Sequence, residues 1–356
     1  MCRGFMNTPF TGNQLQFSLS YYANEIMSQD IYSFGLSSDN ATAEYLNTVF
    51  AVYHHEAEAS YEIAEQLFYN KLYYHFKNTG AELSSETEEN MAKLAAIRKH
   101  SMMQDRIEYE KKYRKRIYVR AEIRNYLLGS SSDEDGTYCY EGNNYRSASD
   151  YFKAIVEEFC RRPYYERERF YFAHHFRSIE NALLNNHAVE LKIKNGASFR
   201  VRVLKIDTDP QSLYHYVVGY SVPADKPDLT PWKQSFRISR IEKIKEIKSV
   251  RGFIKAADQK KLIAAIQEKG IQFVGSDTNE IIVRLTDNGI KKYNQQIHLR
   301  PTVSKIINKH DFVFKTTETQ IEYYFMKFGP DAEIIKPESL RNKFRETFLL
   351  TCNVYN

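Results

Sequence analysis

The distribution of proline constrains this chain more than any other feature of its sequence. Between Pro9 and Pro163 there is no proline, whereas seven of the nine prolines lie from Pro210 onward. A proline inside a helix removes a hydrogen bond and costs about 3 kcal/mol, so a proline-free stretch of this length permits long helices. The later prolines lie among short β-type runs and turn dipeptides. The sequence therefore predicts an α+β protein whose first half is mainly helical.

Length and composition bound the class of protein. A chain of 356 residues is expected to form two to four domains, and its 42% apolar residues are typical of a globular protein. The net charge of +5 is mild, so a polyanion site requires local clustering of charge. The four cysteines lie far apart without zinc-finger spacing, and no export signal or membrane-length apolar segment is present. We expect a reduced cytoplasmic protein without metal, cofactor or membrane contact.

The N-terminal region combines one strand with two helices. "QLQFSLS" alternates Leu15, Phe17 and Leu19 with polar residues, a pattern of a strand with one buried face. A helix over 21–33, a Gly-Leu-Ser turn and a long helix follow. This order resembles the ribbon-helix-helix fold, which implies a dimer in which two chains pair their single strands. The outward side chains would then contact nucleic acid, although an ordinary polar strand face gives the same pattern: Gln14, Gln16 and Ser18.

A third helical stretch is predicted from Ser85 to Leu128. Between Arg98 and Arg120 it carries nine basic residues and three acidic ones, a local net charge of +6. A solvated helix face and a ridge that follows phosphates both fit this pattern. The candidate contacts in this segment are Lys111, Lys112, Arg114, Lys115 and Arg116.

The second half of the chain changes to a period of two. "SFRVRVLKI" places Phe199, Val201 and Val203 on one face and Arg200 and Arg202 on the other. "LYHYVVGYS" and "SFRISRIEKI" continue the alternation, with an Asn-Gly hairpin signal before them. Four short antiparallel strands of this kind predict a small SH3-like or Sm-like barrel.

Two motifs in this half resemble the WYL domain and its C-terminal extension, often called WCX. "FRISRI", Phe236 to Ile241, matches the arginine-rich final strand of the WYL domain, while the namesake triplet aligns with His215, Tyr216 and Val217 and keeps only the tyrosine. The Phe-Gly turn at 328–329 and the Pro-Glu-Ser-Leu-Arg segment at 337–341 resemble the extension. The resemblance implies a ferredoxin-like C-terminal module that contributes dimer contacts. The expected domains are a ribbon-helix-helix-like module (1–78), a helical connecting region (79–183), a WYL domain (184–250) and a WCX-like dimerisation domain (251–356).

The candidate pocket of the barrel places guanidinium forks beside aromatic faces. Such a set suits phosphate pairing and base stacking, whereas core aromatics with rim arginines are the structural alternative. We expect Val218 and Tyr220 to pack inward and His215 to face the arginine side. Arg237 and Arg240 can serve one pocket only if their strand bends. The pocket candidates are Lys192, Arg200, Arg202, His215, Tyr216, Arg237 and Arg240.

Enzyme signatures are absent from the sequence, which has no P-loop, GxGxxG, GxSxG, HExxH or paired-cysteine motif. Two binding functions remain. The combination of modules resembles the WYL-domain accessory proteins of type VI-D CRISPR-Cas systems, which bind single-stranded RNA and stimulate the RNA-guided nuclease. The alternative is a ribbon-helix-helix and WYL transcriptional regulator that binds operator DNA and senses a nucleotide-like ligand. We favour the accessory protein, with a homodimer in either case.

Overall fold

The computed structural model describes residues 12–78, 84–105, 113–128, 145, 147–209, 212–275 and 279–355. The chain divides between Ala173 and His174 into two compact units, and each is described by itself. The first unit is mainly helical, and the second contains two antiparallel sheets with helices, so the α+β class predicted from the sequence is confirmed.

The first unit contains one two-stranded ribbon and six described helices. Ser20 begins the first helix because its hydroxyl oxygen accepts the Ala23 N–H. Its elements are β1 (Gln14–Ser18), α1 (Tyr21–Ser33), α2 (Ala41–Asn78), α3 (Ser85–Asp105), β2 (Arg114–Tyr118), α4 (Ala121–Leu128), α6 (Ala148–Arg161) and α7 (Tyr164–Tyr171).

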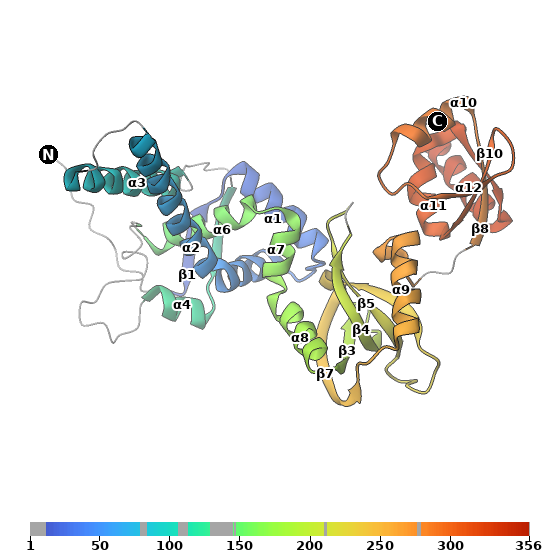
Figure 1. The fold of residues 1–356 in the computed structure, drawn as a ribbon, viewed down its shortest axis with the longest axis horizontal. Helices are drawn as coiled ribbons and strands as arrows, with labels where there is room; N and C mark the ends of the chain where they lie inside the picture. The colour runs from blue at the N-terminus through green and yellow to red at the C-terminus, as the bar shows by residue number, and fades with distance from the viewer. Residues whose placement is uncertain are drawn as a thin grey trace. The chain divides into compact units, whose positions relative to one another are not determined.

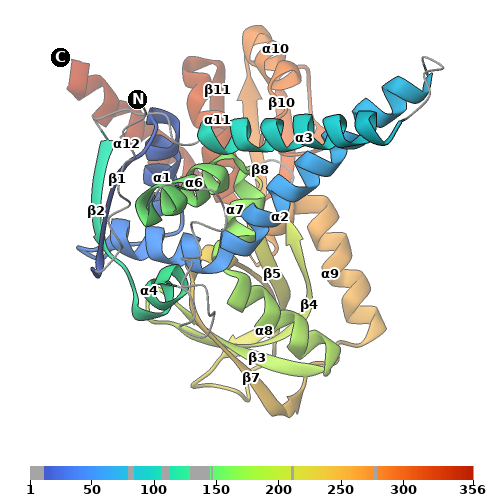
Figure 2. The ribbon, with the colours of Figure 1, turned by 90° about the vertical axis from the view of Figure 1, so that its left-hand side faces the viewer.

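The predicted helix over 85–128 is confirmed at 85–105 and 121–128 but is wrong at 114–118. Helix α3 ends at Asp105, and Arg114–Tyr118 forms strand β2, which pairs antiparallel with β1. Figure 2 shows the two strands side by side. We expected β1 to pair with the strand of a second chain, but along this edge it pairs with β2 of its own chain. The burial of this segment has the period of a strand, because Lys115 and Ile117 point inward while Arg114, Arg116 and Tyr118 are exposed.

Aromatic rings fill the core of the first unit. The Phe50 ring of α2 stacks on Phe152 of α6 with 4.7 Å between centroids, and Phe17 of β1 lies 5.4 Å from the same Phe152 ring. Both phenylalanines of the stack are fully buried. Helices α2 and α6 thus hold the inner face of the ribbon, and the alternate side chains of β1 and β2 point away from this core.

The second unit begins with a five-stranded antiparallel sheet in the order β6-β5-β4-β3-β7. Gly219 allows β4 and β5 to approach closely, since a Cβ there would lie 2.1 Å from the Arg202 carbonyl oxygen. Helices α8 and α9 lie on opposite sides of the sheet (Figure 1). The elements are α8 (Ala173–Leu184), β3 (His187–Ile193), β4 (Ser198–Thr208), β5 (His215–Pro223), β6 (Trp232–Arg237), η2 (Ile238–Arg240), β7 (Ile241–Arg251), α9 (Ala256–Lys269) and η3 (Ile271–Phe273).

The C-terminal part of the second unit is a four-stranded antiparallel sheet in the order β11-β8-β10-β9. Two of its connections are helical, one joining β8 to β9 and one joining β10 to β11. The elements are β8 (Asn279–Leu285), α10 (Asp287–Gln295), β9 (Val303–Ile306), β10 (Asp311–Thr316), α11 (Glu318–Phe325), η4 (Met326–Asp331), β11 (Ala332–Lys336) and α12 (Glu338–Tyr355).

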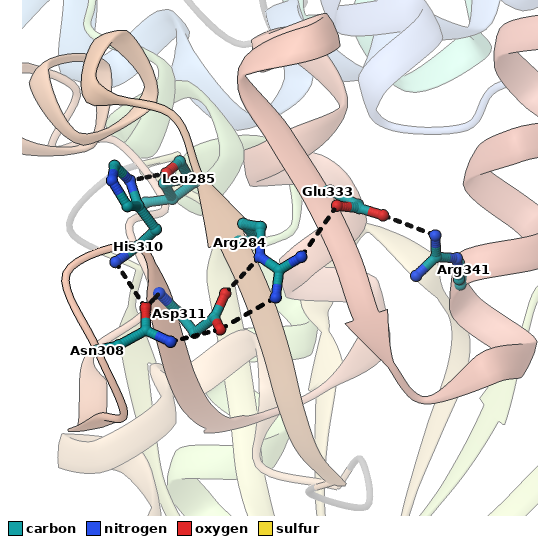
Figure 3. A network of polar contacts seen from close by, with 7 residues as sticks. All are labelled: Arg284, Leu285, Asn308, His310, Asp311, Glu333 and Arg341. Atoms are coloured by element: carbon teal, nitrogen blue, oxygen red, sulfur yellow. Dashed lines mark hydrogen bonds and ion pairs between the residues drawn. The ribbon is translucent and has the colours of Figure 1, made fainter.

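The two faces of this C-terminal sheet differ in chemistry. Val283, Phe314 and Ile334 lie in an apolar core with residues of α11 and α12. On the other face Arg284 donates from Nε and Nη2 to Asp311 at 2.7 and 3.1 Å, and Glu333 follows on its other side (Figure 3). Asp311, Arg284 and Glu333 therefore form a row of charged side chains across β10, β8 and β11.

No helix among the described residues is both long enough and apolar enough to cross a membrane.

Candidate nucleic-acid interface

The ribbon of the first unit brings together two groups of candidates that lie far apart in the sequence. In the strand register, Gln14 lies opposite Tyr118, Gln16 opposite Arg116, and Ser18 opposite Arg114. Directly opposed residues share one face of an antiparallel pair. Because Leu15, Phe17 and Ile117 occupy the buried face, these six side chains form the outer face of the ribbon, which we call the ribbon face.

Lys115 belongs to the opposite face of the ribbon. It lies across from Phe17, and burial lowers the pKa of its ammonium group. This position removes Lys115 from the set of candidates that face outward. The remaining two candidates of this segment, Lys111 and Lys112, lie outside the described residues.

The five-stranded sheet separates its predicted site residues into an inner and an outer face. Val201 and Val203 are buried as expected, and Arg200 and Arg202 point to the other face. In the strand register, Tyr220 lies opposite Arg202, and Tyr216 lies between Asp207 and Arg237. The outer face therefore carries Lys192, Arg200, Arg202, Tyr216 and Arg237, which are five of the seven pocket candidates.

Arg237 and Tyr214 form a cation–π contact beside this outer face. The guanidinium carbon lies 3.3 Å from the centroid of the Tyr214 ring, a stacked cation–π arrangement. Both side chains are half-buried, so packing restricts their motion. The contact with Tyr214 thus fixes the orientation of a planar group of the kind that pairs with phosphate oxygens and base edges.

Two lysines of the five-stranded sheet, Lys205 and Lys192, are paired with carboxylates. Lys205 and Asp207 form an ion pair at 2.5 Å. Burial opposes ionisation of the Asp207 carboxyl, but hydrogen bonds from Lys205 and the Thr208 N–H outweigh it and hold the pKa of Asp207 below its usual range. Lys192, by contrast, is exposed and pairs with Glu242 at 2.8 Å. Lys192 is therefore partly neutralised within the chain.

Arg202 lies in a cleft at the edge of the outer face. The cleft has a volume of about 380 Å³ and brings a guanidinium, an ammonium group and a tyrosine ring together. The Tyr220 hydroxyl donates to the Asp258 carbonyl at 3.1 Å, which anchors this ring against α9. The buried Nε of Arg200, on the same sheet face, has no hydrogen-bond partner among the described residues. The residues that line the cleft are Arg202, Tyr220, Thr230, Pro231, Phe253, Ile254, Lys255 and Asp258.

His215 does not face the arginine side, and that expectation is wrong. It is 6% exposed and contacts the Phe176 ring of α8, with 5.0 Å between the ring centroids. The expectation that Val218 and Tyr220 pack on the side away from the arginines is wrong as well. Both lie on the arginine side, where they pack against α9, which covers part of the outer face. Tyr216 packs there too, whereas His215, one residue earlier, points to the inner face.

Arg240 lies beyond the end of β6. Residues Ile238–Arg240 form a 3₁₀ turn, so the chain bends after Arg237 as a shared pocket would require. Arg240 itself is exposed. Its carbonyl oxygen accepts the Lys194 N–H at 3.0 Å, which fixes the turn against the β3-β4 hairpin.

Two pairs of adjacent histidines occur in the chain, His54–His55 and His174–His175, and one imidazole of each pair lies against a backbone carbonyl oxygen. His54 is buried with its Nδ1 2.9 Å from the Phe50 carbonyl oxygen, and His175 Nε2 lies 3.1 Å from the Ile241 carbonyl oxygen. Burial lowers the pKa of both imidazoles. Within the described ranges, no group of three His, Cys, Asp or Glu residues could hold a metal ion.

Two aromatic residues of these surfaces were not among the sequence candidates. Tyr214 precedes β5 and shares its alternation with Tyr216, which is the signal that could have identified it. Tyr118 is 71% exposed at the end of β2. It could be recognised only once Arg114–Tyr118 was known to be a strand.

Comparisons with known proteins find a relation at the level of fold. No protein-family model matches the chain, and no curated protein does. A solved structure described as a CRISPR Cas-related protein aligns with a TM-score of 0.68 over 99% of this chain and 97% of the other, at 17% identity. Proteasome accessory factor B/C of Arthrobacter aurescens aligns over 47% of this chain and 25% of the other, at 11% identity and a TM-score of 0.22. The first comparison shows a shared fold, and the second is too weak to support any inference.

Proposed function

We propose that this protein is a non-enzymatic accessory factor that binds single-stranded RNA on the outer face of the five-stranded sheet and stimulates an RNA-guided RNA nuclease of type VI-D CRISPR-Cas systems. The observation that carries the proposal is the stacked pair of Arg237 and Tyr214 at 3.3 Å, on the same sheet face as Arg200 and Arg202.

The chemistry of this face suits a single strand better than a duplex. Unpaired bases expose their rings, so they can stack on tyrosine or on a guanidinium plane, while basic side chains follow the phosphates. Besides the arginines, the face carries exposed lysines on β7, Lys243 and Lys245, which lie opposite Lys192 and Glu190. Basic groups thus extend across the sheet from β7 to β6.

The fold shared with a CRISPR Cas-related protein supports the proposed setting, since it extends over almost the whole of both chains. We further propose a homodimer whose contacts lie in the C-terminal sheet module. Under this proposal the WYL-like sheet is the RNA-binding part, and the partner is the effector nuclease.

The test is binding of a fluorescently labelled 20-nucleotide single-stranded RNA by anisotropy, at two salt concentrations. Stacking contributes about 1–3 kcal/mol per base, so Arg237→Ala is expected to weaken binding about tenfold or more. Arg345→Ala removes an exposed arginine of α12 and serves as the matched control, expected to bind like the wild type. Circular dichroism establishes that both variants are folded.

A second assay addresses the nuclease. Addition of the wild-type protein to a type VI-D effector with guide and target RNA should raise cleavage of a reporter RNA, and Arg237→Ala should not. Equal RNA affinity of wild type and Arg237→Ala contradicts the proposed site. Unchanged cleavage with the wild-type protein contradicts the accessory role.

The alternative function, a DNA-binding regulator, is favoured by one observation, the ribbon face of the first unit. Its prediction differs: duplex DNA binds in a sequence-specific manner, and RNA binds only as a salt-sensitive background. The same anisotropy measurement with a 20-base-pair DNA duplex distinguishes the two functions.

A further inference from the structure

The C-terminal sheet of the second unit ends at a short edge strand. β9, Val303–Ile306, pairs with β10, and no described strand lies along its other side. The Ile307 N–H, directly after β9, donates to the Asp311 carbonyl at 2.9 Å. Successive residues of an antiparallel strand direct their N–H and C=O groups to alternate sides. The backbone groups of Ile306 therefore point away from β10, toward the open side of the strand.

Little in β9 prevents the addition of another strand. Edge strands of natural proteins usually carry charges or proline that discourage pairing. The edge strand β7 of the five-stranded sheet follows this rule, since six of its eleven residues are charged. β9 carries a single charged residue, Lys305, and is followed by a further isoleucine. Ile306 and Ile307 are 57% and 52% exposed, so the edge offers apolar surface as well as open backbone groups.

The chain around β9 is basic. Residues 288–310 contain five Lys or Arg residues and no Asp or Glu. Two of these lysines, Lys292 and Lys309, form ion pairs at 2.7 Å with aspartates of the same module. Lys305, by contrast, is exposed and has no carboxylate partner in the part of the chain that the structure describes. The charge of this edge therefore favours a partner that brings carboxylates.

We propose that β9 is a docking site at which an extended, acidic segment of a partner protein adds as a further strand of the C-terminal sheet. In strand addition, main-chain hydrogen bonds supply affinity and alternate side chains supply specificity. The backbone groups of Ile306 would bond the added strand, apolar side chains would cover Ile306 and Ile307, and a carboxylate would face Lys305. Under the proposed function the partner is the effector nuclease, and the identity of the partner rests on that proposal.

Two other occupants fit this edge less well. A second copy of the chain would bring two basic segments together, and like charges across neighbouring strands are destabilising. A single-stranded RNA would leave the isoleucines exposed, because residues 302–309 contain no aromatic ring on which a base could stack. An acidic extended segment satisfies the open backbone groups, the isoleucines and Lys305 together.

The first experiment measures binding of the full-length protein to a purified type VI-D effector with its guide RNA, by biolayer interferometry. Ile306→Pro removes the outward N–H, and proline is tolerated at an edge position whose N–H faces solvent. We expect this variant to bind the effector about tenfold more weakly, because it loses a main-chain hydrogen bond and clashes with the added strand. Lys305→Glu, which reverses the charge, should weaken binding about threefold or more.

The matched control is Lys327→Glu, which makes the same change of charge. Lys327 is an exposed residue of η4, directly before β11 at the opposite edge of the sheet. This variant should bind the effector like the wild type. Circular dichroism establishes that all three variants are folded, and Lys305→Glu keeps the test decisive if Ile306→Pro is not.

The second experiment measures amide hydrogen exchange of residues 303–307 by mass spectrometry, in the free protein and in its complex with the effector. Formation of the complex should slow exchange in this segment. Unchanged exchange there, or equal effector binding by the wild type and both β9 variants, overturns the proposal. Slowed exchange with a 20-nucleotide RNA alone, or at high concentration of the protein alone, also overturns it, because the edge would then bind RNA or a second copy.

The outcomes separate this inference from the proposed function. Raised cleavage of the reporter RNA, together with effector binding that is insensitive to both β9 variants, contradicts the docking site alone. A wild-type protein that neither binds the effector nor raises cleavage contradicts the accessory role, and the docking proposal fails with it. RNA affinity should be equal for the wild type, Ile306→Pro and Lys305→Glu, because β9 is not part of the five-stranded sheet.

Discussion

Asp30 of α1 accepts two hydrogen bonds from the Arg167 guanidinium, with Nε to Oδ2 and Nη2 to Oδ1 each at 2.7 Å. The two side chains are almost fully buried, and the Tyr45 hydroxyl donates to Asp30 Oδ2 at 2.8 Å. The bidentate pair joins α1 to α7 across the first unit. A buried pair of this geometry mainly specifies which elements meet, because its attraction is offset by the loss of water around both charges.

Replacing Asp30 by Asn removes the carboxylate and leaves the buried guanidinium without its counterion. We expect the free energy of unfolding of the first unit to fall by about 3–5 kcal/mol, the range for breaking one side of a buried pair. Urea denaturation followed by circular dichroism measures this loss. Asp39→Asn, at an exposed position of the α1-α2 turn, is the control and should change stability little. Equal midpoints for the two variants would contradict the assigned role.

His215 offers a test that separates stability from binding. Because its ring is buried against Phe176 on the inner face, His215→Ala leaves a cavity, and we expect a loss of about 1–3 kcal/mol in unfolding free energy. RNA affinity, measured where the variant remains folded, should stay within twofold of the wild type. A large loss of RNA affinity in a fully folded variant would contradict this prediction and show that His215 contributes to binding.

The sequence predicted the local elements of this protein better than their partners. The strand at Gln14–Ser18 was recognisable because Leu15 and Phe17 alternate with polar residues. Strand β2 was not, because its inward positions are Lys115 and Ile117, so hydrophobicity does not alternate along it. The pairing of two such strands, far apart in the chain, depends on the packing of α2 and α6 beneath them.

The candidate site shows the same division between local pattern and tertiary context. Alternation placed Arg200 and Arg202 on one face and Val201 on the other, as the structure has them. It could not reveal that α9 covers part of the arginine face, since this contact joins Val218 to Leu262, far along the chain. His215 was therefore assigned to the wrong side.

Gly219 provides a test of the close packing of β4 against β5. An added Cβ would lie 2.1 Å from the Arg202 carbonyl oxygen, which is backbone and cannot move without disturbing the ladder. We expect Gly219→Ala to destabilise the sheet by about 2 kcal/mol or more, seen as a lower denaturation midpoint. Gly12→Ala, where an added Cβ comes no closer than 3.7 Å to Gln14 N, is the matched control. A neutral Gly219→Ala would show that the strands lie further apart.

The C-terminal module should lose stability in acid through Asp331. The Lys292 ammonium, with further hydrogen bonds from Thr286 and Asn288, lowers the pKa of this carboxyl to about 2. The unfolded chain has an ordinary aspartate pKa near 3.9. Since the folded pKa is the lower one, the stabilisation is fully present above about pH 4 and is lost as the pH falls toward 2.

The variant Asp331→Asn isolates this contribution. It should be less stable than the wild type at pH 7, and the difference in denaturation midpoint should shrink between pH 4 and pH 2, because the wild-type carboxyl becomes protonated there. Thermal unfolding at pH 7, 4, 3 and 2 measures both curves. Glu338→Gln, a carboxylate in the first turn of α12, serves as the comparison. A difference between wild type and Asp331→Asn that stays constant down to pH 2 would contradict the lowered pKa.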